Sequence, residues 1–208
     1  MKFKFGKTIV LLMFFSAFTF AQTTFSSNAS DTRNQATFES NAPLEDIVGV
    51  SNKLNSNITL NLNDITSSPK GNVKVELGAM KTGIDLRDQH LRSANWLNTE
   101  KYPHAEFELT EISDASSKNL SDTKPVKATA KGKLSIHGVT KEISAPVELT
   151  YYKETDQTKA RVAGNLLKVS AGFTIKLSDY KISIPSMVAG KVDETIKVSV
   201  NFIASDSK

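Results

Sequence analysis

Apolar and polar residues alternate with a period of two over most of this chain, and this pattern restricts the possible folds more than any other feature. Successive side chains of a β-strand point to opposite faces of a sheet. Half-apolar alternation therefore predicts antiparallel sheet with one buried and one solvated face. The alternating runs lie at residues 58–62, 73–77, 107–109, 126–136, 143–151, 169–177 and 196–202.

Turn-forming residues separate these runs. The stretch "SSPKGN" at 67–72 places Pro69 and Gly71 between the first two runs, which predicts a β-hairpin there. The polar stretch 113–124 is expected to be a loop, and His137-Gly138 is expected to form a tight turn. About eight strands joined in this way in one domain favour a barrel or a sandwich.

The size of the inward-facing residues favours the barrel. Several runs approach ten residues, a length that suits tilted barrel strands, and an eight-stranded barrel is just wide enough to hold one small ligand. Small inward residues would leave room for such a ligand, although they can also serve only to fit a tight corner. These small residues are Ala128, Ala130, Gly132, Ala145 and Ala171.

The N-terminal segment has the features of an export signal. Lys2, Lys4 and Lys7 precede an apolar run at 8–20, and Ala21 provides a small residue at a cleavage site before Gln22. The alternative is an uncleaved membrane anchor, but the run is shorter than the roughly 20 residues that a spanning helix needs. We therefore expect residues 1–21 to be a signal peptide and the protein to be periplasmic or secreted.

Two further ranges complete the expected domain organisation. Residues 22–34 are polar and small, so we expect a flexible leader there. We expect residues 35–205 to form the β-barrel domain.

Charge and cysteine content exclude several classes of protein. The chain has 26 basic and 22 acidic side chains, and residues 1–21 contain three of the lysines and no acid, so 23 basic residues remain against 22 acidic ones. A net charge of +1 without a basic stripe argues against nucleic acid as a partner. The absence of cysteine excludes disulfides, thiolate metal sites and a lipid-modified N-terminal cysteine. The processed protein is thus expected not to be membrane-integral.

One segment, residues 85–97, has helical rather than strand periodicity. Asp85 is expected to cap its N-terminus, and Asp88 and Arg92 are spaced to form an i,i+4 ion pair. We expect this short helix to cap one end of the barrel with Trp96 beside it. Its modestly apolar face consists of Leu86, His90, Ala94 and Leu97.

The same region carries a specific family resemblance. The segments "TGIDLRDQHLRSANWLNTEKYPHAEFEL" at 82–109 and "GKLSIHGVTKEISAPVEL" at 132–149 resemble the YceI family, with its TG-x-x-x-RD-x-HLRS, KYP and IHGVTK motifs. The segments at 173–185 and 192–204 are similar to the last two strands of that family. Residues 36–62 depart from the pattern, because they lack the two histidines that many members have there.

The resemblance implies a lipocalin-like antiparallel barrel, usually periplasmic, that holds a polyisoprenoid or a related amphiphile in an apolar tunnel. The inward positions of the strands, together with Trp96, are then the expected ligand contacts. These residues are Leu60, Val75, Leu77, Trp96, Phe107, Leu109, Leu134, Ile136, Val147, Leu149, Phe173 and Ile175.

The residues give little support to catalysis or to metal binding. There is no G-x-S-x-G elbow or phosphate-binding glycine loop. Acidic residues near His90 in a first helical turn are explained by the helix dipole, and metal ligands need a convergence that spacing alone does not show. We expect no catalytic residue, cofactor or metal. A secreted β-sandwich interaction module, an enzyme acting on a small hydrophobic substrate, and a homodimeric state remain open.

Overall fold

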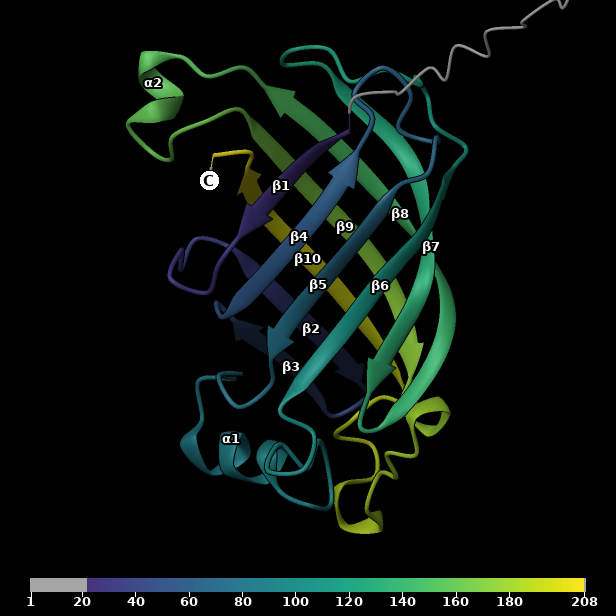
Figure 1. Cartoon of the computed structure of the whole chain (residues 1–208). Helices are drawn as coiled ribbons and strands as arrows, with labels where there is room; N and C mark the ends of the chain where they lie inside the picture. The colour runs from purple at the N-terminus through teal and green to yellow at the C-terminus, as the bar shows by residue number, and fades with distance from the viewer. Residues whose placement is uncertain (1–21, 208) are drawn as a thin grey trace, which may run out of the picture.

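The computed structural model describes residues 22–207, so the expected signal peptide lies outside the described part. Ten strands form a single antiparallel sheet (Figure 1). Their bounds are β1 Thr23–Ser27, β2 Gln35–Ala42, β3 Glu45–Ser51, β4 Leu54–Leu60, β5 Lys70–Glu76, β6 His104–Ser113, β7 Pro125–Ile136, β8 Val139–Tyr152, β9 Leu166–Lys176 and β10 Thr195–Ser205.

Eight of these strands close into the barrel that the alternation predicted. The order is β1-β4-β5-β6-β7-β8-β9-β10, and an additional pairing of β10 with β1 closes the circle. The hairpin predicted around residues 67–72 is confirmed as the antiparallel pair of β4 and β5. A register shift between Leu109 and Glu111 interrupts the β6–β7 pairing, and such bulges help a barrel to bend.

The predicted flexible leader at 22–34 is wrong for its first part, which is strand β1. Thr23 to Ser27 pair with β4 from Leu60 to Ser56, and Phe25 is completely buried. The polar composition did not indicate a strand. β1 is stabilised by backbone pairing with β4 and β10 and by the burial of one phenylalanine, and not by an alternating apolar pattern. The barrel domain therefore begins at β1 and not at residue 35.

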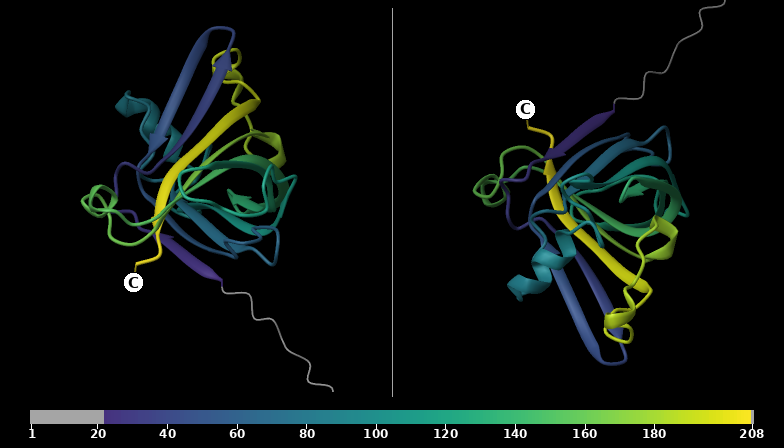
Figure 2. Two further views of the ribbon diagram at one scale, coloured as in Figure 1. Left: turned by 90° about the horizontal axis from the view of Figure 1, so that it is seen from above. Right: turned by 90° about the horizontal axis from the view of Figure 1, so that it is seen from below.

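Strands β2 and β3 form a second hairpin that the alternation did not predict. β2 pairs with residues 197–201 of β10, whereas β1 pairs with β10 only at Ser205. β3 pairs with β2, and an isolated β-bridge between Val50 and Lys81 joins β3 to the segment that follows β5. The hairpin projects sideways from the barrel when the molecule is viewed along its axis (Figure 2). Its buried positions include Ser40, Gly49 and Ser51. Because these residues are small or polar, the alternation of apolar and polar residues that predicts a strand is interrupted here.

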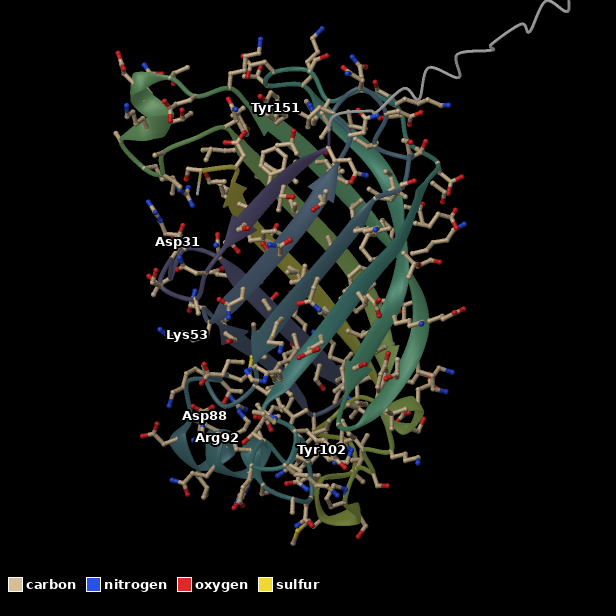
Figure 3. The ribbon with its side chains drawn as sticks, viewed as in Figure 1. Asp31, Lys53, Asp88, Arg92, Tyr102 and Tyr151 are labelled. Carbon is tan, nitrogen blue, oxygen red and sulfur yellow. The ribbon has the colours of Figure 1, made fainter. Side chains whose placement is uncertain are left out.

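One end of the barrel is sealed by packed side chains. Phe25 and Tyr151 meet edge to face at 6.2 Å, and Ile65 and Leu120 from two loops pack into the same cluster. Backbone hydrogen bonds between residues 62–65 and 118–120 hold these loops together. Tyr151 is labelled at this closed end in Figure 3.

Helix α1, Asp85–Arg92, lies at the opposite end but differs from its prediction. It ends at Arg92 and not near residue 97, and the residue at its N-cap is Ile84, without a side-chain cap. Asp85 is therefore not the cap. The helix still contributes to this end of the barrel as predicted, because Leu86, Arg87, His90 and Leu91 line the cavity, although Leu86 remains 59% exposed. A second, four-residue helix, α2 at Asp156–Lys159, lies near the closed end in the connection between β8 and β9.

Candidate functional site: an apolar barrel cavity

The barrel contains a cavity of about 600 Å³. Small-molecule sites in proteins commonly measure roughly 300–1,000 Å³, so one lipid-like molecule can fit. The cavity wall is strongly apolar because inward positions on the barrel strands are almost all aliphatic or aromatic. On β7, for example, every even position from Val126 to Ile136 is buried, as the alternation predicted.

The structure places all twelve predicted ligand contacts on the cavity wall. Eleven come from strands or their ends, and the twelfth, Trp96, follows helix α1. Trp96 is half-buried and packs with Leu97 against the cluster at the open end. Contact between these twelve residues and a ligand stays a prediction, because their place on the wall does not show what binds there.

The small inward residues have two different roles. Ala130, Ala145 and Ala171 line the cavity, so their size does leave room. Gly132 does not leave room, because a Cβ there would lie 2.7 Å from Cζ of Phe107 and 2.1 Å from the carbonyl oxygen of Glu108. The Phe107 ring therefore covers Gly132, and glycine is needed for this close approach.

Three segments surround the open end of the cavity, which we call the mouth. They are the turn of the β2–β3 hairpin, helix α1 with the residues before it, and the β9–β10 connection with the short 3₁₀ helices η1 Ser178–Tyr180 and η2 Ser186–Val188 (Figures 1 and 2). Each segment contributes to the cavity wall, for example Glu45, Leu86 and Val188.

Hydrogen bonds join the hairpin to the β9–β10 connection. The backbone N–H of Leu44 donates to the carbonyl oxygen of Gly190 at 3.0 Å, and that of Asp193 donates to Oγ of Ser40 at 2.8 Å. Ser40 is almost completely buried, so its hydroxyl is satisfied by this contact. The hairpin is thus held in place on this side of the mouth.

The TG-x-x-x-RD motif forms a polar network on the other side of the mouth. Arg87 donates to a carboxylate oxygen of Glu45 at 2.5 Å, to Oγ1 of Thr82 at 2.9 Å and to the Thr82 carbonyl oxygen at 3.1 Å. Thr82 in turn donates its N–H and its hydroxyl to Oδ1 of Asp88, each at 2.7 Å. Gly83 has a φ of +82°, which suits the turn between Thr82 and the helix.

Asp88 is a buried acceptor and not only a charge at a helix start. Its side chain is 1% exposed, and its other oxygen lies 3.4 Å from Nζ of Lys81. Burial acts to raise the pKa of Asp88, but the hydrogen bonds from Thr82 and the charge of Lys81 outweigh burial, so the pKa lies below its usual value. The expected ion pair with Arg92 is not among the ion pairs of the described residues. Figure 3 labels Asp88 and Arg92 at this end of the molecule.

The IHG and KYP motifs meet at the mouth end as well. His137 Nδ1 lies 3.1 Å from the carbonyl oxygen of Tyr180, and the rings of His137 and Tyr102 meet edge to face at 5.0 Å. His137 and Gly138 both have positive φ, at 52° and 75°, so they make the tight turn predicted for them. His137 therefore joins the β7–β8 turn to two other connections.

Charged groups that line the cavity lie at the mouth or face outward. Glu45, Arg87, His90 and Lys191 belong to the mouth segments, whereas Glu106 pairs with Lys74 on the outer face at 2.5 Å.

Among residues 22–207, no cluster of three or more His, Asp or Glu side chains is arranged to hold a metal ion. In the same part of the chain, no helix is long and apolar enough to cross a bilayer.

Comparison with known proteins identifies the family. The model of the YceI-like domain matches residues 28–204, which is most of the chain. The chain belongs to the YceI-like family. Strand β1 lies just outside the matched range, although it closes the barrel.

Individual relatives match over shorter stretches. A UPF0312 protein of Photorhabdus laumondii is 36% identical over 80 residues, which are 38% of this chain and 37% of the relative. Protein YceI of Escherichia coli O6:H1 is 33% identical over 116 residues, which are 56% of this chain and 53% of the relative. The chain therefore spans about half or less of the length of these curated relatives.

Solved structures share the fold at low sequence identity. BcnA of Burkholderia cenocepacia matches with a TM-score of 0.66 at 14% identity, over 83% of this chain and 97% of BcnA. A domain of Saccharophagus degradans described as polyisoprenoid-binding matches with a TM-score of 0.64 at 14% identity, over 89% of this chain and 99% of that domain. The barrel of this YceI-like protein is thus an established architecture. The β-sandwich that the sequence analysis kept as an alternative is wrong.

Sequence reasoning missed the part of the wall that the β2–β3 hairpin and the β9–β10 connection supply. Their signals are weak: Ala36, Phe38 and Ser40 alternate only briefly before Pro43, and the apolar residues of 182–192 have no regular spacing. The missed wall residues include Thr37, Phe38, Ser40, Glu45, Ile47, Ile182, Val188 and Val192.

Proposed function

We propose that this YceI-like protein binds an elongated hydrophobic molecule, such as a polyisoprenoid, in its barrel and carries or sequesters it. One observation carries the proposal: a continuous apolar cavity of about 600 Å³ is sealed at one end, and its charged groups are confined to the other. Such a site accepts a tail in its depth and leaves a polar head group at the mouth. The fold shared with a domain described as polyisoprenoid-binding supports the proposal.

The size of the interaction is adequate without special anchors. At about 0.3 kcal/mol per non-hydrogen atom, a tail of about 20 carbons contributes roughly 6 kcal/mol. This corresponds to a dissociation constant of the order of tens of micromolar. A head group that contacts Arg87 or Lys191 at the mouth would strengthen binding.

The alternative of an enzyme has less support from the geometry. Hydrolysis by a nucleophile and a base requires the two side chains to lie within hydrogen-bond reach of each other. His90 is on the exposed side of the mouth, and in the described part of the chain no hydrogen bond or ion pair joins its ring to a carboxylate. We therefore propose a binding protein and not a catalyst.

Two measurements test ligand binding. Mass spectrometry of lipids extracted from the purified protein should reveal a bound hydrophobic molecule. Trp96 is the only tryptophan and lines the cavity, so titration with a long-chain prenol should quench or shift its fluorescence. A protein that carries no lipid, and whose emission ignores every hydrophobic titrant, would contradict the proposal.

We further propose that the protein acts outside the cytoplasm, in the periplasm or beyond it. The support is the sequence of residues 1–21, with its lysines, its apolar run and its small residue at Ala21. N-terminal sequencing of the protein from the cell envelope should begin at Gln22. Recovery of an intact Met1 in the membrane fraction would contradict export by a cleaved signal.

A further inference from the structure

Exposed large apolar side chains gather at one end of the molecule. Within residues 22–207, five such side chains are exposed, and four of them lie on the three segments that surround the mouth. The four are Leu44 at 73%, Ile84 at 52%, Leu86 at 59% and Met187 at 85% exposure. We call these four residues the apolar rim. Large exposed apolar patches mark sites of interaction with proteins or membranes.

The apolar rim is continuous with the cavity. Ile84 and Leu86 contribute to the cavity wall while remaining more than half exposed. Leu44 lies beside Gly190, where a Cβ would come within 3.3 Å of its Cδ1, so the hairpin turn contacts the loop that follows Met187. On the side of helix α1, Ile84 and Leu86 therefore connect the apolar wall of the cavity with the outer surface of the mouth.

We propose that the apolar rim docks on the surface of a lipid bilayer, so that the ligand passes between the membrane and the cavity without crossing water. The inference rests on the proposed lipid-binding function, for which it names the partner. A molecule with a 20-carbon tail has a very low concentration in water, because each buried methylene contributes about 0.8 kcal/mol to its preference for an apolar phase. When the mouth touches the bilayer, the ligand can enter the cavity without first dissolving in water.

The charges around the mouth favour a membrane over a second protein. Segments 41–46, 81–93 and 177–194 together contain five basic and seven acidic side chains: Lys81, Arg87, Arg92, Lys181 and Lys191 against Glu45, Asp46, Asp85, Asp88, Asp179, Asp193 and Glu194. The buried centre of a protein–protein interface is depleted of charged residues. Interspersed charges of both signs instead match the head groups of zwitterionic lipids, which also carry both signs.

The charges around the mouth also specify the kind of membrane. Attraction to anionic lipids requires a basic cluster, and these three segments instead carry a net charge of −2. Binding should therefore depend on insertion of the apolar rim and occur on neutral phosphatidylcholine vesicles. It should change little between about 50 and about 500 mM salt, over which simple charge attraction is strongly screened.

The experiment is flotation of the purified, export-processed protein with phosphatidylcholine vesicles. The double variant Leu44→Gln/Met187→Gln alters two rim residues that do not line the cavity. It should lower partitioning onto vesicles at least tenfold, while Trp96 fluorescence still reports prenol binding in solution. Val48→Gln is the matched control, because Val48 is 51% exposed in the same hairpin but lies on the face opposite Ile47. This control should float as the wild type does.

Several outcomes would overturn the docking surface. Equal flotation of wild type and double variant would do so, as would binding that requires anionic lipid and disappears in high salt. A wild-type dimer in solution that the double variant converts to monomer would show that the rim is covered by a second copy. Rim-dependent flotation by a protein that takes up no prenol would support docking and count against the ligand-binding function, so the two proposals fail separately.

Discussion

Arg87 of helix α1 and Glu45 of strand β3 form an ion pair with a separation of 2.5 Å, although they are 42 residues apart in the sequence. The pair joins two of the three segments that surround the mouth. Because Arg87 is 24% and Glu45 38% exposed, water and salt screen the pair, and its contribution to stability should be only about 0–1 kcal/mol. Its importance is positional, since it fixes the helix relative to the hairpin.

Removing this ion pair should change ligand release more than stability. In Glu45→Gln, helix α1 loses its charged contact with the hairpin, so the mouth should open more often and the dissociation rate of a bound fluorescent prenol should rise severalfold. Affinity differences within one binding site usually appear in the off-rate. Stopped-flow displacement measures this rate. Glu111→Gln is the control, because its pair with Lys131, at 2.8 Å, lies away from the mouth segments; an equal effect in both variants would contradict the positional role.

Filling the cavity should prevent uptake. Ala130 lies on the cavity wall, and Ala130→Phe places a ring inside it. We expect loss of prenol binding by Trp96 fluorescence, and destabilisation of about 1–3 kcal/mol from overpacking. Lys133→Phe, on the outer face of the same strand, should bind normally. Normal binding by a folded Ala130→Phe protein would show that the ligand does not occupy this part of the barrel.

Asp88 should make the protein sensitive to acid. Its pKa is lowered in the folded state, so its ionised form contributes stability that is complete above the unfolded pKa of about 3.9 and is lost as the pH falls through the lower folded value. Asp88→Asn should cost about 1–3 kcal/mol at pH 7, because the hydrogen bonds lose a charged acceptor and Lys81 loses its partner. Urea unfolding from pH 7 down to pH 3 measures the difference, which should shrink below pH 4. A difference independent of pH would contradict the assignment.

Gly132, buried in β7, and Gly172, exposed in β9, should respond in opposite ways to alanine. In Gly132→Ala the new methyl group meets the Glu108 carbonyl and the Phe107 ring, so the free energy of unfolding should fall by about 1–3 kcal/mol. In Gly172→Ala it meets only a carbonyl oxygen at 4.0 Å, so loss of unfolded-state entropy should leave stability unchanged or raise it by up to about 1 kcal/mol. Denaturant midpoints test both; equal losses would contradict the close packing assigned to Gly132.

Much of the wall could be predicted because the direction of a side chain on a strand is a local property. Leu134 and Ile136 are two residues apart, so they must share a face, and their apolar nature identifies it as the inner one. The same argument placed Val147, Leu149, Phe173 and Ile175 inside the barrel. The turn at His137-Gly138 was predictable for the same reason, since its conformation depends on those two residues.

Contacts between distant segments could not be predicted in this way. Phe25 is buried only because β4 and β10 leave a gap that β1 fills, and nothing in the polar stretch around it indicates that gap. Asp88 looked like a charge at a helix start, but Thr82 and Lys81 fold back to surround it. Helix α1 was predicted at one end of the barrel, but the sequence did not indicate that the hairpin and the β9–β10 connection share the mouth with it.

The sequence alone thus determined the all-β class, the inward face of each long strand and membership of the YceI-like family, because alternation and motif spacing are properties of neighbouring residues. Only the tertiary structure decided how the barrel closes, which end stays open and which charges meet at the mouth. Those features depend on pairings such as Ser26 with Ser205 and Glu45 with Arg87, whose free energy is gained only when segments far apart in the chain come together.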